Sequence, residues 1–449
     1  MNDLIWFLSE DFQFELKEKA QCDACDRFEN VLSNYCRLFI DELSSLKSAH
    51  DIGVLKEFPS ENKHKLYDWA DLNYDKIKKN INVYEKLFEA IIYTYKLFLK
   101  GKHFHATLHL FDILEEYEIV DALEPKDLGL FYKGRKVDKG VDIKSVNFFY
   151  HIPFDERYRV SNQRFSVSGQ PILYLDSSIL DVLYELRSEI NSYPEIAIAS
   201  FSFDSIIDET INSIQKPIKI YDITNQILKL FYEKMAPLNH YGLDESIDFN
   251  NLDFDIDKQF KKFILMHLCT FRIKEGRKFV EEYVLGQLLT EALRINNYDG
   301  IKYPSTQFDI KDLRFYMFSY SAVKENLALF TKYSESEKYD YKLLERFLIQ
   351  PLHELTGIKT IKEYQQQIKY LLNAIFIKSF KICGNDPFNQ FENASSCIAK
   401  IYKCECYSKV NDMEYFTLPF AKIELQSQMN FLQNILERLN TFERQKQKN

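Results

Sequence analysis

Basic side chains gather in one part of the chain and could hold an anionic ligand. Arg157, Arg159 and Arg164 lie close together, and Lys133 and Arg135 precede them. Arginine presents a planar fork of donors that can bind a phosphate at two points, whereas lysine acts as a point charge. The whole chain carries 58 basic and 67 acidic residues, a formal net charge of −9. We therefore expect a local positive site on a protein that does not suit nucleic acid as a partner.

A second group of residues could act on a bound ligand. Tyr174 lies in an apolar run, Glu185 follows on a predicted helix, and Ser305 and Asn326 adjoin later apolar runs. A carboxylate can stabilise developing positive charge, a tyrosine ring can stack on a base, and Ser or Asn can hydrogen-bond a sugar or an amide. Taken singly, each is also typical of an ordinary surface or core position. Their residue types alone therefore do not distinguish a functional site from ordinary positions.

The elements that must position these residues change in kind along the chain. Apolar residues recur with helical spacing over 84–99 and again from 104 to 114, with Gly101 between them, which predicts an antiparallel pair of helices. From about residue 127, short apolar runs predict strands, and two amphipathic stripes, 179–190 and 279–292, predict helices between them. The predicted strands are 130–132, 148–152, 172–175, 195–203, 217–223, 301–303, 315–320 and 327–330.

Three regions follow from this pattern. We expect a helical N-terminal domain over 1–120, a mixed domain over 127–332 and a helical C-terminal extension over 333–449, which together make an α+β protein. Apolar residues over 425–439 have heptad spacing for only about two heptads. This stripe is compatible with packing on the body of the protein or with a homodimer.

Common nucleotide-binding and hydrolase motifs are absent from the sequence. None of the 12 glycines forms a G-x-G-x-x-G or P-loop pattern, so side chains would have to hold any phosphate. No G-x-S-x-G motif occurs. The segment from His353 begins like the zinc-protease motif H-E-x-x-H, but Gly357 stands where the second histidine is needed.

The cysteines and histidines leave two alternatives open. Cys22 and Cys25 form a C-x-x-C pair, and with Cys36, His103, His105 and His109 they could gather a zinc ion. A single pair without a second one is also typical of free thiols, and we expect no metal.

The same composition predicts a cytoplasmic protein without a membrane partner. The first residues lack a basic leader and soon reach Glu10 and Asp11. The longest apolar run, 90–99, is interrupted by Thr94 and Lys96 and is shorter than the roughly 18–20 residues of a membrane span. Eight cysteines in 449 residues are too few for a disulfide scaffold.

The order of the candidate residues resembles the RES-domain family, which is named for its Arg, Glu and Ser. The family pattern has an R-F-S stretch followed by L-Y-L, a helix with Glu, a G-I-x-Y-P-S element, and Asn before an L-A-L-F strand. The matching residues, in order, are Arg164, Tyr174, Glu185, Ser305 and Asn326. The resemblance covers about residues 127–332. The His-Ile-Pro-Phe loop and the helices in front are similar to the branch with a HEPN-like N-terminal domain.

This resemblance implies a mixed domain similar in fold to ADP-ribosyltransferases and an NAD-degrading activity. Members of the family cleave the nicotinamide–ribose bond of NAD, as a glycohydrolase or phosphorylase, and many are toxins held by an antitoxin. The resemblance therefore implies NAD as substrate, no metal, an antitoxin or inhibitory protein as partner, and a role as a toxin or in phage defence. It implies Glu185, Arg164 and Ser305 as catalytic residues, and Lys133, Arg135, Arg157, Tyr174 and Asn326 as residues that bind NAD.

The chain departs from the family pattern at Lys133, which stands where the first Arg is usual. Lysine keeps the charge but loses the fork, so a weaker grip on phosphate and a non-catalytic NAD-binding regulatory protein stay open. An ADP-ribosyltransferase with a macromolecular acceptor is a further alternative. A HEPN ribonuclease is disfavoured, because the match to the Arg-x4–6-His motif of those enzymes, Arg346 to His353, lies outside the N-terminal helices and is interrupted by Pro351.

Overall fold

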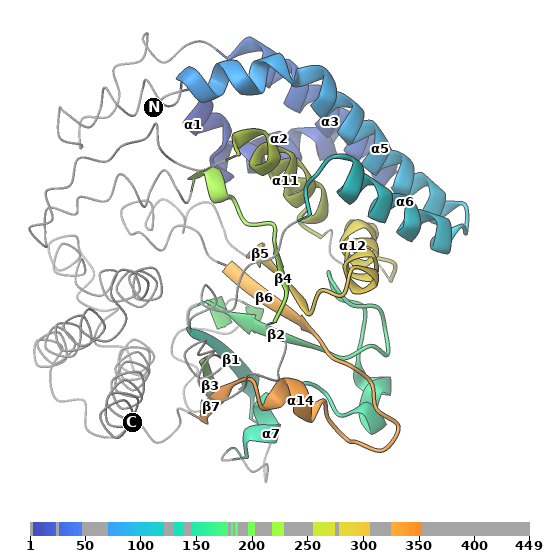
Figure 1. Cartoon of the computed structure of the whole chain (residues 1–449), viewed down its shortest axis with the longest axis vertical. Coiled ribbons are helices and arrows are strands. Elements are labelled where there is room, and N and C mark those ends of the chain that lie inside the picture. Colours follow the sequence, from blue (N-terminus) through green and yellow to red (C-terminus); the bar gives the residue numbers. More distant parts are fainter. Residues whose placement is uncertain are drawn as a thin grey trace, which may run out of the picture. The chain divides into compact units, whose positions relative to one another are not determined.

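The computed structural model describes residues 3–23, 27–46, 71–120, 130–137, 143, 145–177, 181–182, 185–186, 196–202, 218–228, 255–273, 278–305 and 325–351. The chain divides into two compact units (Figure 1). The first unit comprises Met1–Ala122, Val160–Gln170 and Tyr221–Val323, and the second comprises Leu123–Arg159, Pro171–Ile220 and Lys324–Asn449. Helices and strands both occur, so the predicted α+β class is confirmed, while the likeness to the ADP-ribosyltransferase fold and the three predicted domains stay predictions.

The first unit consists mainly of helices. They are α1 (Asp3–Phe7), α2 (Glu10–Asp23), α3 (Phe28–Ser45), α5 (Ile81–Leu99), α6 (His103–Glu116), α11 (Ile256–Cys269), the 3-10 turn η6 (Glu281–Tyr283) and α12 (Val284–Ile295). Two short strands accompany them, β4 (Ile220–Asp222), at the boundary of the two units, and β5 (Gly300–Pro304).

Helices α5 and α6 are the antiparallel pair that the sequence predicts, and they lie side by side in Figure 1. Gly101 sits between them with φ +73°, a conformation that suits glycine and lets the chain reverse. The helices of this unit pack through aromatic rings. The centroids of Phe7 and Phe39 are 4.8 Å apart and those of Tyr84 and Phe260 are 4.7 Å apart.

The second unit is built on a twisted antiparallel sheet. Its elements are β1 (Leu130–Lys136), α7 (Val146–Phe149), the 3-10 turn η3 (Phe154–Arg159), β2 (Ile172–Asp176), β3 (Ile196–Ser202), β6 (Glu325–Phe330), α14 (Tyr341–Leu344) and β7 (Leu348–Pro351). Within this unit the strands lie in the order β6-β2-β1-β3-β7, and neighbouring strands pair antiparallel along their described residues.

Strand β1 pairs very unequally with its two neighbours. It pairs with β3 along its whole length, from Leu130 opposite Ser202 to Lys136 opposite Ile196. Its register with β2 comprises one position, Tyr132 opposite Asp176, among the described residues of these strands. Beyond that position the two strands part, so the backbone groups that face the gap need other partners.

Apolar side chains cover both faces of this sheet. One face carries a buried cluster that includes Phe131, Leu173, Leu327 and Phe201 and continues into α7 and α14. The other face carries Tyr132, Ile196 and Ile198 packed against Val182 and Leu186. Successive side chains of a strand alternate between faces, which accounts for the division between Phe131 and Tyr132.

Two predicted elements differ in the structure. The run 148–152, predicted as a strand, enters helix α7 and then an irregular segment. A short aromatic run does not distinguish strand from helix by its periodicity, and here Arg135 and Asp340 bond the segment instead of a neighbouring strand. Strand β7 lies in the region that we predicted to be helical after residue 332. The predicted strand 315–320 and the heptad stripe 425–439 lie outside the described residues.

Candidate active site

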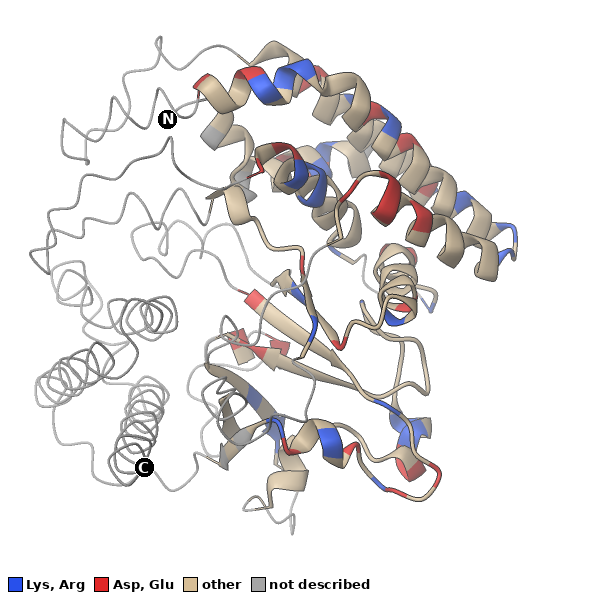
Figure 2. Cartoon of the chain, viewed as in Figure 1, with Lys and Arg blue, Asp and Glu red and all other residues tan. Residues whose placement is uncertain are grey.

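The register of β2 and β6 brings polar side chains together at one end of the sheet. Asp176 lies opposite Asn326, and Tyr174 lies opposite Ala328. Because side chains alternate, Tyr174, Asp176 and Asn326 share one face, while the leucines between them point into the core. Figure 2 shows the acidic residues at this end of β2 and β6 and the basic residues on β1.

Glu185 meets Asn326 on this face. Asn326 Nδ2 donates to Glu185 Oε1 at 3.1 Å. Asn326 is only 1% exposed, whereas Glu185 is exposed to solvent. The Oδ1 atom of Asn326 is buried and has no hydrogen-bond partner among the described residues. The result is an accessible carboxylate whose orientation is held by a buried amide.

The segment that carries Glu185 lies very close to β1, and glycine makes this possible. A Cβ at Gly134 would collide with Val182 Cγ1 and come within 3.0 Å of Leu186 Cδ1. Val182 and Leu186 flank Glu185 in sequence and pack on Tyr132. Gly134, which the sequence analysis did not single out, therefore helps to set the height of Glu185 above the sheet. The sequence signal for this close approach was a glycine just after the predicted strand 130–132.

Lys133 fills the gap where β1 and β2 part. Its Nζ donates to the Tyr174 backbone carbonyl at 2.9 Å. Burial lowers the pKa of the Lys133 ammonium, Arg135 lowers it further, and Asp176 opposes this. The lysine thus replaces a strand amide as the donor to Tyr174. Contact of Lys133 with a phosphate stays a prediction.

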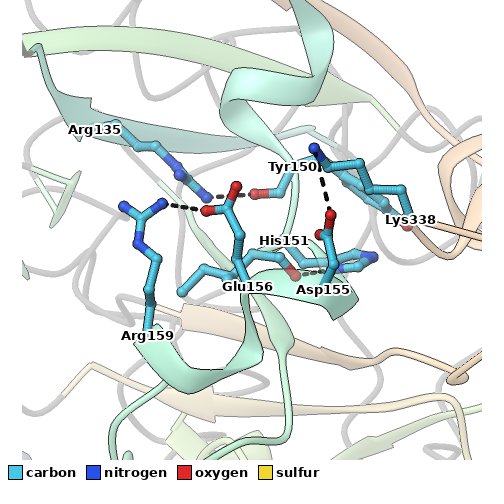
Figure 3. A network of polar contacts seen from close by, with 8 residues as sticks. Arg135, Tyr150, His151, Asp155, Glu156, Arg159 and Lys338 are labelled. Carbon is cyan, nitrogen blue, oxygen red and sulfur yellow. Dashed lines mark hydrogen bonds and ion pairs between the residues drawn. The ribbon is translucent and has the colours of Figure 1, made fainter.

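Arg135, two residues further along β1, also donates to a backbone carbonyl. Its guanidinium donates to the Tyr150 carbonyl at 2.7 Å and lies 5.7 Å from the centroid of the Phe148 ring. In Figure 3 it extends from β1 toward Tyr150, with Glu156 and Arg159 beside it. Burial, followed by the charge of Arg159, lowers its pKa.

The turn η3 carries two further basic residues, Arg157 and Arg159, on the surface. Arg157 is exposed and stacks on Tyr333 with 5.5 Å between the guanidinium carbon and the ring centroid. Arg159 pairs with Glu156 (Figure 3). An exposed pair of this kind contributes little to stability. Arg157 is therefore accessible to a ligand.

Arg164 and Ser305 belong to the first unit. Arg164 is buried, and its two terminal nitrogens donate to the carbonyls of Cys269 and Phe271, each at 2.9 Å. These bonds join the R-F-S stretch to the end of α11, where helix carbonyls lack partners. Ser305 follows β5, and its Oγ is buried without a hydrogen-bond partner among the described residues.

The R-F-S stretch is also held from α12. Gln287 Nε2 donates to the carbonyls of Gln163 and Ser166 at 3.0 and 3.1 Å, and Thr290 Oγ1 donates to the Phe165 carbonyl at 3.0 Å. Gly286 allows this contact, because a Cβ there would collide with the Arg164 carbonyl oxygen. Among the described residues, the contacts of the R-F-S stretch anchor it as a turn between α11 and α12.

Asp176 is the residue of the sheet face that the sequence analysis missed. It follows Leu175 at the end of β2, between Tyr132 on one side and Asn326 on the other. Burial raises its pKa well above the usual value, the charges of Glu185 and Asp181 add to this, and Lys133 opposes it. The available signal was an acidic residue directly after the apolar run Ile-Leu-Tyr-Leu.

Metal ligands do not gather among the described residues. No group of three or more His, Cys, Asp or Glu side chains there could hold an ion. Cys25 lies outside the described ranges. Burial raises the pKa of the Cys36 thiol to about 12, so that it is not an activated thiolate. Within the same ranges, no helix is both long and apolar enough to cross a membrane.

Fold and geometry together define a mixed α/β protein with a polar sheet face, an exposed carboxylate and a buried amide that orients it. The chain is similar to the protein described as "Putative toxin YopC" of Bacillus subtilis (strain 168), with 26% identity over 304 residues. The alignment covers 67% of this chain and 60% of that relative, so the chain spans less than two thirds of the relative's length. No family model matches the chain. No solved structure matches it.

Proposed function

We propose that the protein cleaves the nicotinamide–ribose bond of NAD, with water or phosphate as acceptor, and that it acts as a toxin. The observation that carries this proposal is the hydrogen bond between Asn326 and Glu185, which joins two residues of the RES-like pattern that are 141 positions apart in sequence. The likeness to a protein described as a toxin supports the second part.

The chemistry of the proposed reaction suits the sheet face. When the bond to nicotinamide breaks, positive charge develops on the ribose, and a fixed carboxylate next to it lowers the energy of that state. Glu185 is exposed, so a ligand can reach it, and its bond to Asn326 limits its rotation. Tyr174 shares the face and offers a ring for stacking on a nicotinamide.

The basic residues divide into two groups in this proposal. Lys133 and Arg135 bond backbone carbonyls of their own unit and hold the sheet in shape. Arg157, on the surface of η3, is the candidate for a phosphate of the dinucleotide. For Arg164 and Ser305, a direct role in the reaction stays a prediction.

Release of nicotinamide from NAD tests the proposal directly. The purified full chain is mixed with NAD in buffers with and without phosphate, and nicotinamide, ADP-ribose and its 1-phosphate are separated by chromatography. Glu185→Gln keeps an oxygen that accepts from Asn326 but removes the charge, so we expect a loss of about 10²–10³-fold in turnover. Glu156→Gln is the matched control, a carboxylate of the same unit that pairs with Arg159 instead.

Two results would contradict the proposal. The first is no nicotinamide from the unaltered chain in either buffer. The second is equal turnover of Glu185→Gln and the Glu156→Gln control. Label transferred from NAD to added protein, without free ADP-ribose, would identify a transferase instead.

In cells, induced expression should lower total NAD and stop growth, and Glu185→Gln should do neither.

A further inference from the structure

The turn between α5 and α6 gathers basic residues on the first unit. No Asp or Glu occurs from Ala90 to Phe111, although the whole chain carries a formal net charge of −9. Three exposed lysines lie around the turn and a fourth lies in the segment before η6: Lys96, Lys100, Lys102 and Lys278. None of these four ammonium groups has an ion pair or a hydrogen bond with a described residue. Figure 2 shows the basic turn at one end of the helix pair.

Large apolar side chains are exposed among these lysines. Phe104 at the start of α6 is 69% exposed, Phe279 before η6 is 49% exposed, and Leu99 at the end of α5 is 44% exposed. An exposed apolar patch with a polar rim is typical of a surface that binds a partner. We call these three residues and the four lysines the hairpin tip.

The hairpin tip is held in one shape by its own contacts. The Gly101 amide donates to the Phe98 carbonyl at 2.9 Å and closes the turn. The ring of Phe98 lies 4.4 Å from that of His103 and nearly parallel to that of Phe279, with 6.4 Å between the last two centroids. This stack joins α5 to the start of α6 and to the segment before η6. A partner can bind without first ordering the turn, which lowers the cost of association.

Exposed acidic residues bound the hairpin tip along both helices. Glu89 precedes Lys96 by seven residues on α5, and Asp112 follows Lys102 by ten residues on α6. At about 1.5 Å per residue, these carboxylates lie about 10 and 15 Å from the lysines along the helix axes. A nucleic acid or an anionic membrane extends well beyond this length and would also meet the carboxylates. A short acidic segment can contact the lysines alone, so the charge pattern favours it.

We propose that the hairpin tip is a docking surface for a short acidic segment of a partner protein, with an aromatic or aliphatic side chain among its carboxylates. The lysines attract the carboxylates before contact, and the apolar side chain packs on Phe104 and Phe279. This inference does not rest on the proposed function, because the hairpin tip belongs to the first unit and Glu185 to the second.

Binding of labelled peptides to the full chain tests this inference. The probe is a synthetic peptide in which glutamates alternate with phenylalanines, and fluorescence anisotropy gives its Kd. A second peptide has Gln in place of every Glu. We expect the acidic peptide to bind about tenfold more tightly than the Gln peptide, because several exposed ion pairs each contribute a little. Its affinity should fall as the salt concentration rises.

Substitutions in the hairpin tip separate the charge from the apolar contact. Lys100→Gln together with Lys102→Gln should weaken binding of the acidic peptide about 3–10-fold, and Phe104→Ser should weaken it about tenfold. Lys76→Gln together with Lys79→Gln is the matched control for charge, since both lysines are exposed. These control changes should leave the Kd as it is in the unaltered chain.

Several results would overturn the inference. They are no binding of the acidic peptide, equal affinity for the acidic and Gln peptides, or equal weakening by the Lys100 and Lys102 changes and by their control. Vesicles with about one third phosphatidylserine and a DNA duplex are tested in parallel. If either binds through Lys100 and Lys102 while the acidic peptide does not, the hairpin tip contacts a membrane or a nucleic acid instead. The release of nicotinamide from NAD is measured separately, so neither result decides the other.

Discussion

Lowering the pH from 7 to 5 should release the segment 332–343 from His151. The amide of Asp340 donates to His151 Nε2 at 3.0 Å, so Nε2 carries no proton, and Nδ1 must donate to the Ile152 carbonyl at 2.7 Å. The ring is 1% exposed and packs on Tyr150. A second proton on the ring would remove the acceptor for Asp340 and place a charge in the core.

The magnitude follows from the pKa of His151. Burial lowers it from 6.5 to about 4, and the bond to Ile152 and the charge of Asp340 only partly oppose this. The unfolded chain binds the proton first, so the stability from the neutral ring is complete above pH 6.5 and is lost as the pH falls toward 4. From these two values the loss between pH 7 and pH 5 is about 2 kcal/mol, or about 20-fold in the opening equilibrium.

Hydrogen exchange read by mass spectrometry measures this opening locally. Asp340 accepts from the amides of Lys332 and Leu343, so peptides across this segment report whether it stays closed. After correction for the intrinsic effect of pH, protection should fall about 20-fold between pH 7 and pH 5. In His151→Gln the protection of this segment should already be lower at pH 7 and should change little at pH 5. In His105→Gln, a change at the exposed start of α6, the protection should follow that of the unaltered chain. Equal protection at both pH values, or the same fall in His151→Gln, would refute the reasoning.

Three further predictions concern the contacts of the R-F-S turn. Gly286→Ala should lower the free energy of unfolding by about 1–3 kcal/mol, and the melting temperature with it, because the new Cβ collides with the Arg164 carbonyl oxygen. Alanine ordinarily stabilises a helix relative to glycine, so an unchanged or higher melting temperature would contradict this packing. Arg164→Lys should lower the free energy of unfolding, measured with a denaturant, by about 1.5–3 kcal/mol, because one ammonium cannot make both carbonyl bonds. A change near zero would show that one of the two bonds is enough to hold the turn. Burial raises the pKa of the Cys269 thiol to about 12, so iodoacetamide at pH 8 should label it only after denaturation, and fast labelling of the folded chain would show that the thiol is accessible.

Periodicity was sufficient for the elements with strong local patterns. The pair α5 and α6 follows from helical spacing and Gly101, and strands β2 and β6 follow from apolar runs. The strand predicted over 148–152 was wrong, because Tyr150 in this run accepts from Arg135 and donates to the Asp340 carbonyl, and both partners are distant in sequence. Local propensity contains no information about such partners.

The candidate site was predictable as a set of residue types but not as a set of contacts. Glu185 and Asn326 are hydrogen-bonded, but Lys133 and Arg135 bond backbone carbonyls, which no side-chain pattern reveals. The Tyr174 carbonyl is available to Lys133 because β1 and β2 part after Tyr132. The place of Asp176 likewise depends on the register of three strands, two of which are far apart in sequence.

The hydrogen bond between Glu185 and Asn326 can form only after a delay during synthesis of the chain. Asn326 lies 141 positions beyond Glu185, and β6 must reach β2 before the bond can form. At about 5–20 residues per second, the ribosome needs roughly 7–28 s to add those positions. For that interval the carboxylate exists without the amide that orients it. A newly made molecule therefore acquires the assembled sheet face only after Asn326 and the rest of β6 have left the ribosome.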